Sequence, residues 1–190
     1  GEADDPRTVV ALGAARQAAA LTAAHGGGAP LLLDVLPLSL GLDVCEGWMH
    51  PVLERGTKLP ATAAQTFTTY MDNQTAVDVQ VYEGQRQRAE DNLKLGEFAL
   101  VGLPQAAAGE LQIEVTFDVN VGGCLTVSAR ETSDGRAARS VQIDSREVRL
   151  SAADVDRMVR DAELHAERDC ARRQAAEAVS DMRRYLRKSA

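Results

Sequence analysis

The chain has 190 residues, 45% of them hydrophobic and 26% charged, which is enough for one globular domain with small appendages but not for two large domains. Its net charge of -7 argues against a nucleic-acid-binding protein, which needs a basic face. No apolar run reaches the roughly 18 residues of a membrane span, and the acidic first residues are unlike a secretory signal. We therefore expect a soluble, cytoplasmic protein with no nucleic-acid or membrane partner.

The three cysteines, Cys45, Cys124 and Cys170, are far apart and odd in number, which favours a reducing compartment over a disulfide framework. The three histidines show no ligand spacing with one another or with the cysteines, so no metal site is predicted.

Charge is unevenly distributed along the chain. Residues 30–144 carry a net charge of -8, whereas residues 145–190 carry +2. The acidic character therefore belongs to the middle of the chain.

Residues 5–24 are predicted to form a helix, with Asp5 as the N-cap, Pro6 in the first turn and many alanines after it. Three glycines, residues 26–28, end that helix. An unusually apolar stretch then follows at residues 30–35, where a linker would normally be polar. A single short helix cannot bury its own apolar surface. This N-terminal part is therefore expected to be the remnant of another domain, a dimerisation segment or a segment bound by a neighbouring chain.

From about residue 38 to residue 143, apolar and polar residues alternate with a period of two in several short runs. Turn sequences such as Asp72-Asn73-Gln74 and Ser133-Asp134-Gly135 separate the runs. At Ser151–Asp154 the pattern changes to a capping box, followed by apolar residues at helical spacing. The predicted fold is mainly β with a C-terminal α part: an antiparallel, eight-stranded β-sandwich followed by a helix.

No phosphate-binding glycine loop and no nucleophile with an adjacent base stands out, so this fragment is not expected to be an enzyme. Glu83, Glu90 and Asp91 are interpreted as solvated loop charges. A sandwich with a helical arm is a binding architecture.

Five segments carry a resemblance to a known family: LLLDVLPLSLGLDV (31–44), TFTTYMDNQTAV (66–77), QVYEGQRQRAEDNLKLGEF (80–98), QIEVTFDVNVGGCLTVSA (112–129) and LSAADVDRMVRDAE (150–163). The chain resembles the substrate-binding half of a seventy-kilodalton heat-shock chaperone of the DnaK type, closest to the eukaryotic cytosolic branch. The resemblance implies a remnant of the nucleotide-binding domain (1–25), an interdomain linker (26–36), a peptide-binding β-sandwich (37–146) and a truncated lid (147–190).

In such chaperones, an extended peptide of a few residues lies between two loops, with one apolar side chain in a pocket. By this resemblance, the residues expected to contact the peptide are Leu42, Val44, Cys45, Phe67, Thr68, Tyr70, Gln74, Val77 and Val79. The apolar residues of this set, taken without the resemblance, favour an ordinary sandwich core. Trp48 stands where the family has a smaller aliphatic residue, and it is expected to narrow the pocket or cover its rim.

The resemblance also implies that Leu31, Leu32, Leu33 and Asp34 dock on an ATPase domain. Without that domain, the linker or the helix before it is expected to occupy another copy's groove or to form a homodimer. Ala108 replaces an arginine of the family's lid latch, and Arg183 replaces its acidic partner. Asp72, or another carboxylate of the acidic sandwich, is therefore expected to pair with Arg183 or Arg187, and the lid is expected to open easily.

By resemblance, the full-length parent is an ATPase that binds ATP or ADP with Mg²⁺ and works with J-domain co-chaperones and nucleotide-exchange factors. This fragment itself is expected to hold no cofactor. Two alternatives stay open: a non-chaperone β-sandwich interaction or oligomerisation module, and a degenerate paralogue that assists another chaperone.

Overall fold

The computed structural model describes residues 13–15, 34–44, 47–132, 138–143 and 150–188, and for a few of these, in β8 and the last turns of α2, only the backbone. The chain divides into two units, residues 1–34 and 35–190. In the first unit, residues 13–15 are helical, as predicted. The rest of the predicted helix 5–24 and most of the linker lie outside the described residues. The described strands and the C-terminal helix all belong to the second unit.

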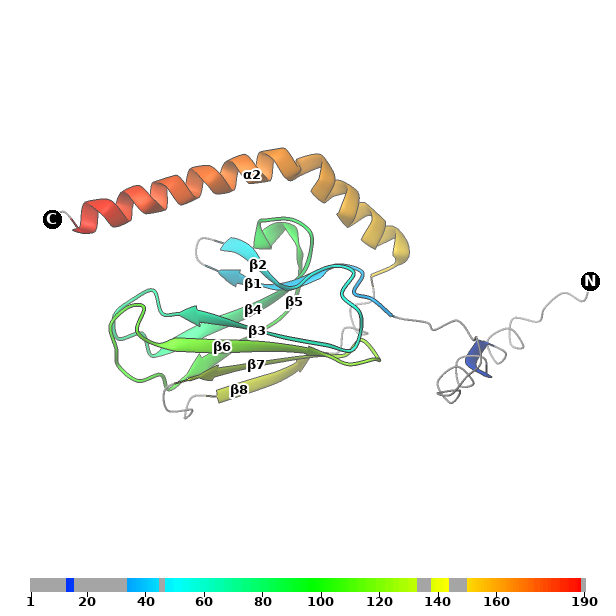
Figure 1. Ribbon diagram of the computed structural model, residues 1–190, viewed down its shortest axis with the longest axis horizontal. Coiled ribbons are helices and arrows are strands. Elements are labelled where there is room, and N and C mark those ends of the chain that lie inside the picture. Colours follow the sequence, from blue (N-terminus) through cyan, green and yellow to red (C-terminus); the bar gives the residue numbers. More distant parts are fainter. Residues whose placement is uncertain (1–12, 16–33, 45–46, 133–137, 144–149, 189–190) are drawn as a thin grey trace, which may run out of the picture. The chain divides into compact units, whose positions relative to one another are not determined.

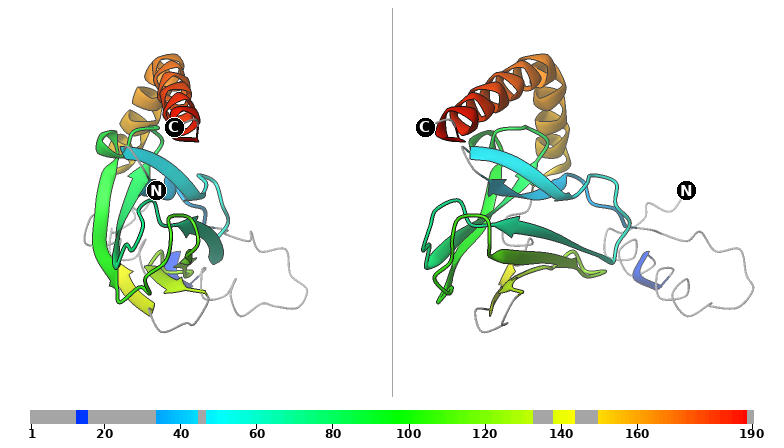
Figure 2. Two further views of the ribbon diagram at one scale, coloured as in Figure 1. Left: turned by 90° about the vertical axis from the view of Figure 1, so that its left-hand side faces the viewer. Right: turned by 60° about the vertical axis from the view of Figure 1, so that its left-hand side comes forward.

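Eight strands form two antiparallel four-stranded sheets, which confirms the predicted sandwich. One sheet has the order β2-β1-β4-β5 and the other β3-β6-β7-β8. Figures 1 and 2 show the sheets as two stacked layers. The strand bounds are β1 Ser39–Val44, β2 Trp48–Leu53, β3 Ala61–Thr68, β4 Ala76–Gly84, β5 Leu93–Val101, β6 Gln112–Val119, β7 Leu125–Glu131 and β8 Ala138–Ile143.

The core forms because alternate residues of each strand point to the same face of a sheet. In β6, Ile113, Val115 and Phe117 are buried, whereas the residues between them are half-buried. β7 shows the same alternation, with Leu125 and Val127 buried. These side chains pack with those of β1, β4 and β5 in a single hydrophobic cluster. Both sheets therefore contribute their inner faces to one core.

A long helix, α2 (Ala152–Lys188), follows the sandwich. Its N-terminus is the predicted capping box: the Asp154 N–H donates to Ser151 Oγ at 3.2 Å, and the Ser151 N–H donates to Asp154 Oδ2 at 3.1 Å. Leu164 (77% exposed) and Met182 (62% exposed) leave part of its apolar surface uncovered by the described residues. No helix among the described residues is long and apolar enough to cross a membrane.

Candidate functional site

The predicted pocket residues lie at the edge of the main core rather than wholly inside it. Leu42 of β1 and Val79 of β4 are buried, each 4% exposed. Phe67 of β3 and Val77 of β4 are half-buried and pack against the same cluster. Leu42 and Val79 therefore form a buried floor, and Phe67 and Val77 form its half-open end, where side chains are still partly accessible to solvent. This gradient differs from a fully closed core, and it suits a site that receives another apolar side chain.

The remaining apolar candidate, Val44, lies at the end of β1, two residues beyond Leu42 and on the same face of the strand. The pairing of β1 with β4 runs from Ser39–Gly84 to Leu42–Val81, so Val44 lies beyond it, and its side chain is not part of the core cluster. Val44 is half-buried and pairs with Trp48 across the β1–β2 hairpin. Cys45, also predicted to contact peptide, lies outside the described residues.

His50 of β2 also reaches this floor, although it was absent from the predicted residues. Its ring meets Phe67 edge-to-face, with centroids 5.8 Å apart, and its cross-strand partner is Leu42. The contact joins the two sheets at the half-open end of the cluster, since Phe67 belongs to the other sheet. Trp48 and His50 are two residues apart in a strand, so their side chains lie on the same face of the sheet. This spacing was the sequence feature that could have pointed to His50.

The connection between β3 and β4 carries the polar candidates. Thr68 is exposed at the end of β3, and Tyr70 is 64% exposed. The Tyr70 N–H donates to Gln74 Oε1 at 3.3 Å, and Gln74 Nε2 donates to the Ala76 carbonyl at 2.9 Å. Gln74 therefore shapes its own loop in this structure, and Tyr70 is an exposed aromatic residue of the same loop.

The expected latch residues are only partly described. Asp72 accepts a hydrogen bond from the Ala108 N–H at 2.8 Å, and the Arg183 and Arg187 side chains lie outside the described residues. Among the linker residues, Asp34 is exposed, and Leu31, Leu32 and Leu33 lie outside the described residues.

The described contact between α2 and the sandwich lies elsewhere, at Arg86 and Asp169. Arg86 Nε donates to Asp169 Oδ2 at 2.7 Å and Nη2 to Oδ1 at 3.2 Å, a two-pronged pair. The Asp169 side chain is 2% exposed and that of Arg86 17%. The hydrogen bond from Arg86 holds the pKa of Asp169 below its ordinary range. Asp91 also pairs with Arg86, at 3.0 Å.

The loop that carries Arg86 is organised by Asn92. Asn92 Oδ1 accepts from the Arg86 N–H at 2.9 Å, and Nδ2 donates to the carbonyls of Arg86 (2.8 Å) and Arg88 (2.7 Å). A Cβ on Gly84 would overlap the Asn92 side chain, so the strand must end in glycine here. The loop also contains a short 3-10 turn, Ala89–Asp91.

We expect Asn92→Ala to destabilise the protein by about 2–3 kcal/mol, because three hydrogen bonds of about 0.5–1.5 kcal/mol each are lost at a partly buried position. Urea unfolding followed by circular dichroism measures the change. Asn92→Asp, which places a carboxylate oxygen where Nδ2 donates to two carbonyls, should also destabilise the protein, because acceptor then faces acceptor. A free energy of unfolding within about 0.5 kcal/mol of wild type for Asn92→Ala would contradict this account of the loop.

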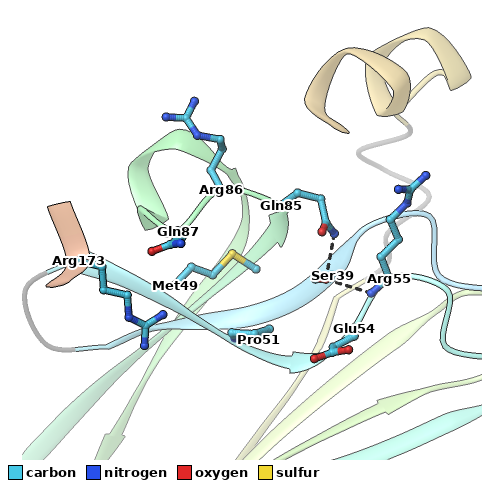
Figure 3. Close-up of a pocket in the computed structure, with 10 residues that line it drawn as sticks. Ser39, Met49, Pro51, Glu54, Arg55, Gln85, Arg86, Gln87 and Arg173 are labelled. Carbon is cyan, nitrogen blue, oxygen red and sulfur yellow. Dashed lines mark hydrogen bonds between the residues drawn. The ribbon is translucent and has the colours of Figure 1, made fainter. Parts of the chain in front are cut away.

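A cavity of about 340 Å³ lies between this loop and the helix (Figure 3). Its lining includes Ser39, Met49 and Pro51 on the sandwich, the loop residue Gln87, and Arg173 of α2. Ser39 Oγ accepts from the Arg55 N–H at 3.0 Å and from Gln85 Nε2 at 2.9 Å, as the dashed lines show. None of the predicted peptide-binding residues lines it, so this cavity is distinct from the candidate peptide site.

The interpretation of Glu83 as a solvated loop charge needs correction, whereas Glu90 and Asp91 are exposed residues of the loop after β4, as predicted. Glu83 lies in β4 and is half-buried, and burial raises its pKa. Asp91 pairs with Arg86 and Glu90 with Arg88, at 3.0 and 3.1 Å respectively. Within the described ranges, no three histidine, cysteine or acidic residues gather as a metal site.

The structure is therefore a two-sheet antiparallel β-sandwich with a half-open apolar floor and a C-terminal helix held against it. Residues 3–190 match the family described as Hsp70 protein. The chain is 42% identical over 184 residues to a heat shock 70 kDa protein of Emericella nidulans, covering 95% of this chain and 28% of that protein. It is 41% identical over 184 residues to a heat shock 70 kDa protein of Penicillium citrinum, covering 95% of this chain and 36% of that one.

The chain therefore belongs to the Hsp70 family of chaperones. It spans 28% and 36% of the length of these two relatives, respectively.

Proposed function

We propose that this chain holds extended apolar segments of unfolded polypeptides in a groove on its β-sandwich, with α2 as the lid. The observation that carries the proposal is the half-open floor: Leu42 and Val79 are closed off, whereas Val44, Phe67 and Val77 remain partly accessible. An apolar side chain bound there gains about 1.5–3 kcal/mol from burial. Main-chain hydrogen bonds, at about 0.5–1.5 kcal/mol each, add affinity without selecting a sequence. Together these terms support loose, micromolar binding of many clients.

The roles of the other segments are part of the same proposal. Residues 1–25 are the end of a nucleotide-binding domain, residues 26–36 the interdomain linker, 37–146 the peptide-binding subdomain and 147–190 the lid. In the full-length parent, an ATPase that uses ATP and Mg²⁺ controls peptide affinity through this linker, assisted by J-domain co-chaperones and nucleotide-exchange factors. The match to Hsp70 along nearly the whole chain supports this assignment.

Fluorescence anisotropy with a labelled peptide, NRLLLTG, tests the proposal directly. We expect saturable binding in the micromolar range, and at least tenfold weaker binding of NRSSSTG, in which serines replace the three leucines. Equal affinity for the two peptides, or no binding of either, would overturn the proposal.

The charge of the sandwich should also influence which peptides bind. Residues 30–144 carry a net charge of -8, so we expect peptides with lysines beside the leucines to bind more tightly than peptides with glutamates there. The difference should shrink as salt is raised from 20 to 500 mM, because mobile ions screen surface charge. Titrations of both peptides at the two salt concentrations measure it. Equal affinities at low salt would reject this preference.

One observation favours a second candidate, an oligomerisation module centred on α2. Leu164, Val179 and Met182 are each more than half exposed on this helix. Sedimentation equilibrium, with and without Leu164→Ser and Met182→Ser, tests it. An oligomer that depends on these residues, together with no peptide binding, would support this second function over the first.

A further inference from the structure

The cavity between the loop after β4 and α2 (Figure 3) has the size and the apolar floor of a site for a small ligand. Its volume of about 340 Å³ falls within the range of small-molecule pockets, about 300–1,000 Å³. The floor consists of Met49, which is 4% exposed, and Pro51, two residues further along β2 and on the same face of the strand. A flat apolar group can therefore lie on this floor.

One buried acceptor of the lining lacks a donor. Gln87 Oε1 is buried and has no hydrogen-bond partner within the part of the chain that the structure describes. The residue is held in place through its backbone, because the Gln87 carbonyl accepts from the Met49 N–H at 2.8 Å. A buried polar atom normally has a partner, and an exception points to a bound ligand or water. The cavity thus offers a preorganised acceptor to an O–H or N–H group.

A second polar group of the lining, Ser39, can donate. Ser39 is buried, and its Oγ accepts from the Arg55 N–H and from Gln85 Nε2, so its hydroxyl hydrogen remains for an acceptor in the cavity. The lining also includes one exposed charge of each sign, Glu54 and the Arg55 side chain. These neighbouring opposite charges offset each other.

Arg173 supplies a cation to the cavity. Its side chain extends from α2 toward Pro51 (Figure 3). Nε donates to Glu177 Oε1 at 3.0 Å, which leaves the Nη groups for another acceptor. Arg86, which also lines the cavity, is already bound by Asp169. A carboxylate in the cavity would therefore find its cation in Arg173.

We propose that this cavity binds a small amphipathic carboxylate that carries a hydrogen-bond donor at its far end. An aromatic ring lies on the floor, where the thioether of Met49 favours it. The donor binds Gln87 Oε1, and the carboxylate accepts from Arg173 and from the Ser39 hydroxyl. The site is separate from the peptide groove and does not depend on the proposed function.

The probe for this site is 3-(4-hydroxyphenyl)propionate, which combines a ring, a carboxylate and a hydroxyl donor. Methionine methyl groups labelled with carbon-13 report where it binds. Met49 lines the cavity, whereas Met71 (51% exposed) and Met182 (62% exposed) do not, and Met49→Leu assigns the Met49 signal. We expect a saturable shift of the Met49 signal, caused by the bound ring, with the Met71 and Met182 signals unchanged.

Two related probes and two variants separate the contacts. 3-Phenylpropionate lacks the hydroxyl and should bind about three- to tenfold more weakly, the effect of one hydrogen bond. Gln87→Leu should remove this difference. 3-(4-Hydroxyphenyl)propanamide lacks the charge and should bind about three- to fivefold more weakly, the effect of a partly exposed ion pair. Arg173→Gln should weaken binding of the carboxylate by the same factor and leave that of the amide unchanged.

Arg130→Gln is the matched control, because it changes an exposed, ion-paired arginine on the other sheet. It should bind every probe like wild type. No saturable Met49 shift with any probe would overturn the inference and assign the Gln87 acceptor to water. Equal shifts of all methionine signals, or affinities indifferent to both Gln87→Leu and Arg173→Gln, would overturn it too.

Competition with peptide distinguishes this site from the groove. Saturating NRLLLTG should leave the affinity of the probe unchanged. Displacement of the probe by this peptide would place the probe in the groove and contradict a separate site. If NRLLLTG does not bind at all, the proposed function fails, whereas the Met49 shift still decides this inference by itself.

Discussion

Replacing Arg86 by methionine should release α2 from the sandwich. The substitution leaves the carboxylate of Asp169, whose side chain is 2% exposed, without its guanidinium partner. Breaking a buried ion pair in this way costs about 3–5 kcal/mol, and the helix avoids this cost by undocking, which returns the carboxylate to water. Each 1.4 kcal/mol is a factor of ten, so docking should weaken by about a hundredfold or more.

Energy transfer from Trp48 to a label on the helix measures this docking. The label is placed on Leu164→Cys, a position 77% exposed, with Cys45 and Cys170 replaced by serine. Transfer should fall in Arg86→Met and stay high in the control Arg130→Met. Arg86→Lys, which keeps the charge but not the two-pronged geometry, should be intermediate. Unchanged transfer in Arg86→Met would show that this pair does not hold the helix.

The pH dependence of docking follows from the lowered pKa of Asp169. A carboxylate whose pKa is lowered in the folded state stabilises that state fully above its ordinary pKa. The stabilisation is lost only as pH falls through the lowered value. Transfer should therefore stay constant from pH 8 to about 5 and fall only below about pH 4, whereas in Arg86→Met it should already be low at neutral pH.

Val77→Phe should abolish peptide binding while the protein stays folded. Val77 is half-buried at the open end of the floor, so a larger ring takes the space that a bound leucine would use. Losing the burial of that leucine removes about 1.5–3 kcal/mol, and the steric block adds to it. We expect affinity for NRLLLTG to fall at least tenfold, measured by anisotropy.

Val101→Phe is the matched control, because it makes the same change on β5 at a position 57% exposed. It should bind like wild type. Val77→Ala, which enlarges the pocket, should weaken binding less than phenylalanine does, and circular dichroism melts check that all three variants fold. A folded Val77→Phe protein with wild-type affinity would show that Val77 does not line the peptide site.

Much of the fold could be predicted because burial follows the alternation of residues. The runs of β6 and β7 alternate cleanly, and the structure buries their apolar members. The strand β2 was not predicted, because Pro51 lies inside this short edge strand. β5 escaped too: Gly96 interrupts its alternation, and its pairing with β4 shifts register between Val81 and Tyr82. The capping box of α2 was predicted because its two residues are local in sequence.

The candidate site was predictable in its apolar part and not in its polar part. Leu42, Phe67 and Val79 follow from strand parity together with the family resemblance. The Arg86–Asp169 pair joins residues 83 positions apart, and neither residue differs in type from the many solvated charges around it. Asn92 likewise gives no pattern that distinguishes a loop-organising amide from an ordinary turn residue. Such contacts depend on how the loop packs, which periodicity does not encode.

The location of bound peptide tests the central claim most directly. A version of NRLLLTG with a photoreactive leucine at its centre can be irradiated on the protein, and the cross-linked residues identified by mass spectrometry. We predict cross-links to the half-open floor, at Val44, Phe67 or Val77, that unlabelled NRLLLTG suppresses by competition. Cross-links confined to α2, or to the cavity lined by Pro51 and Arg173, would contradict the account.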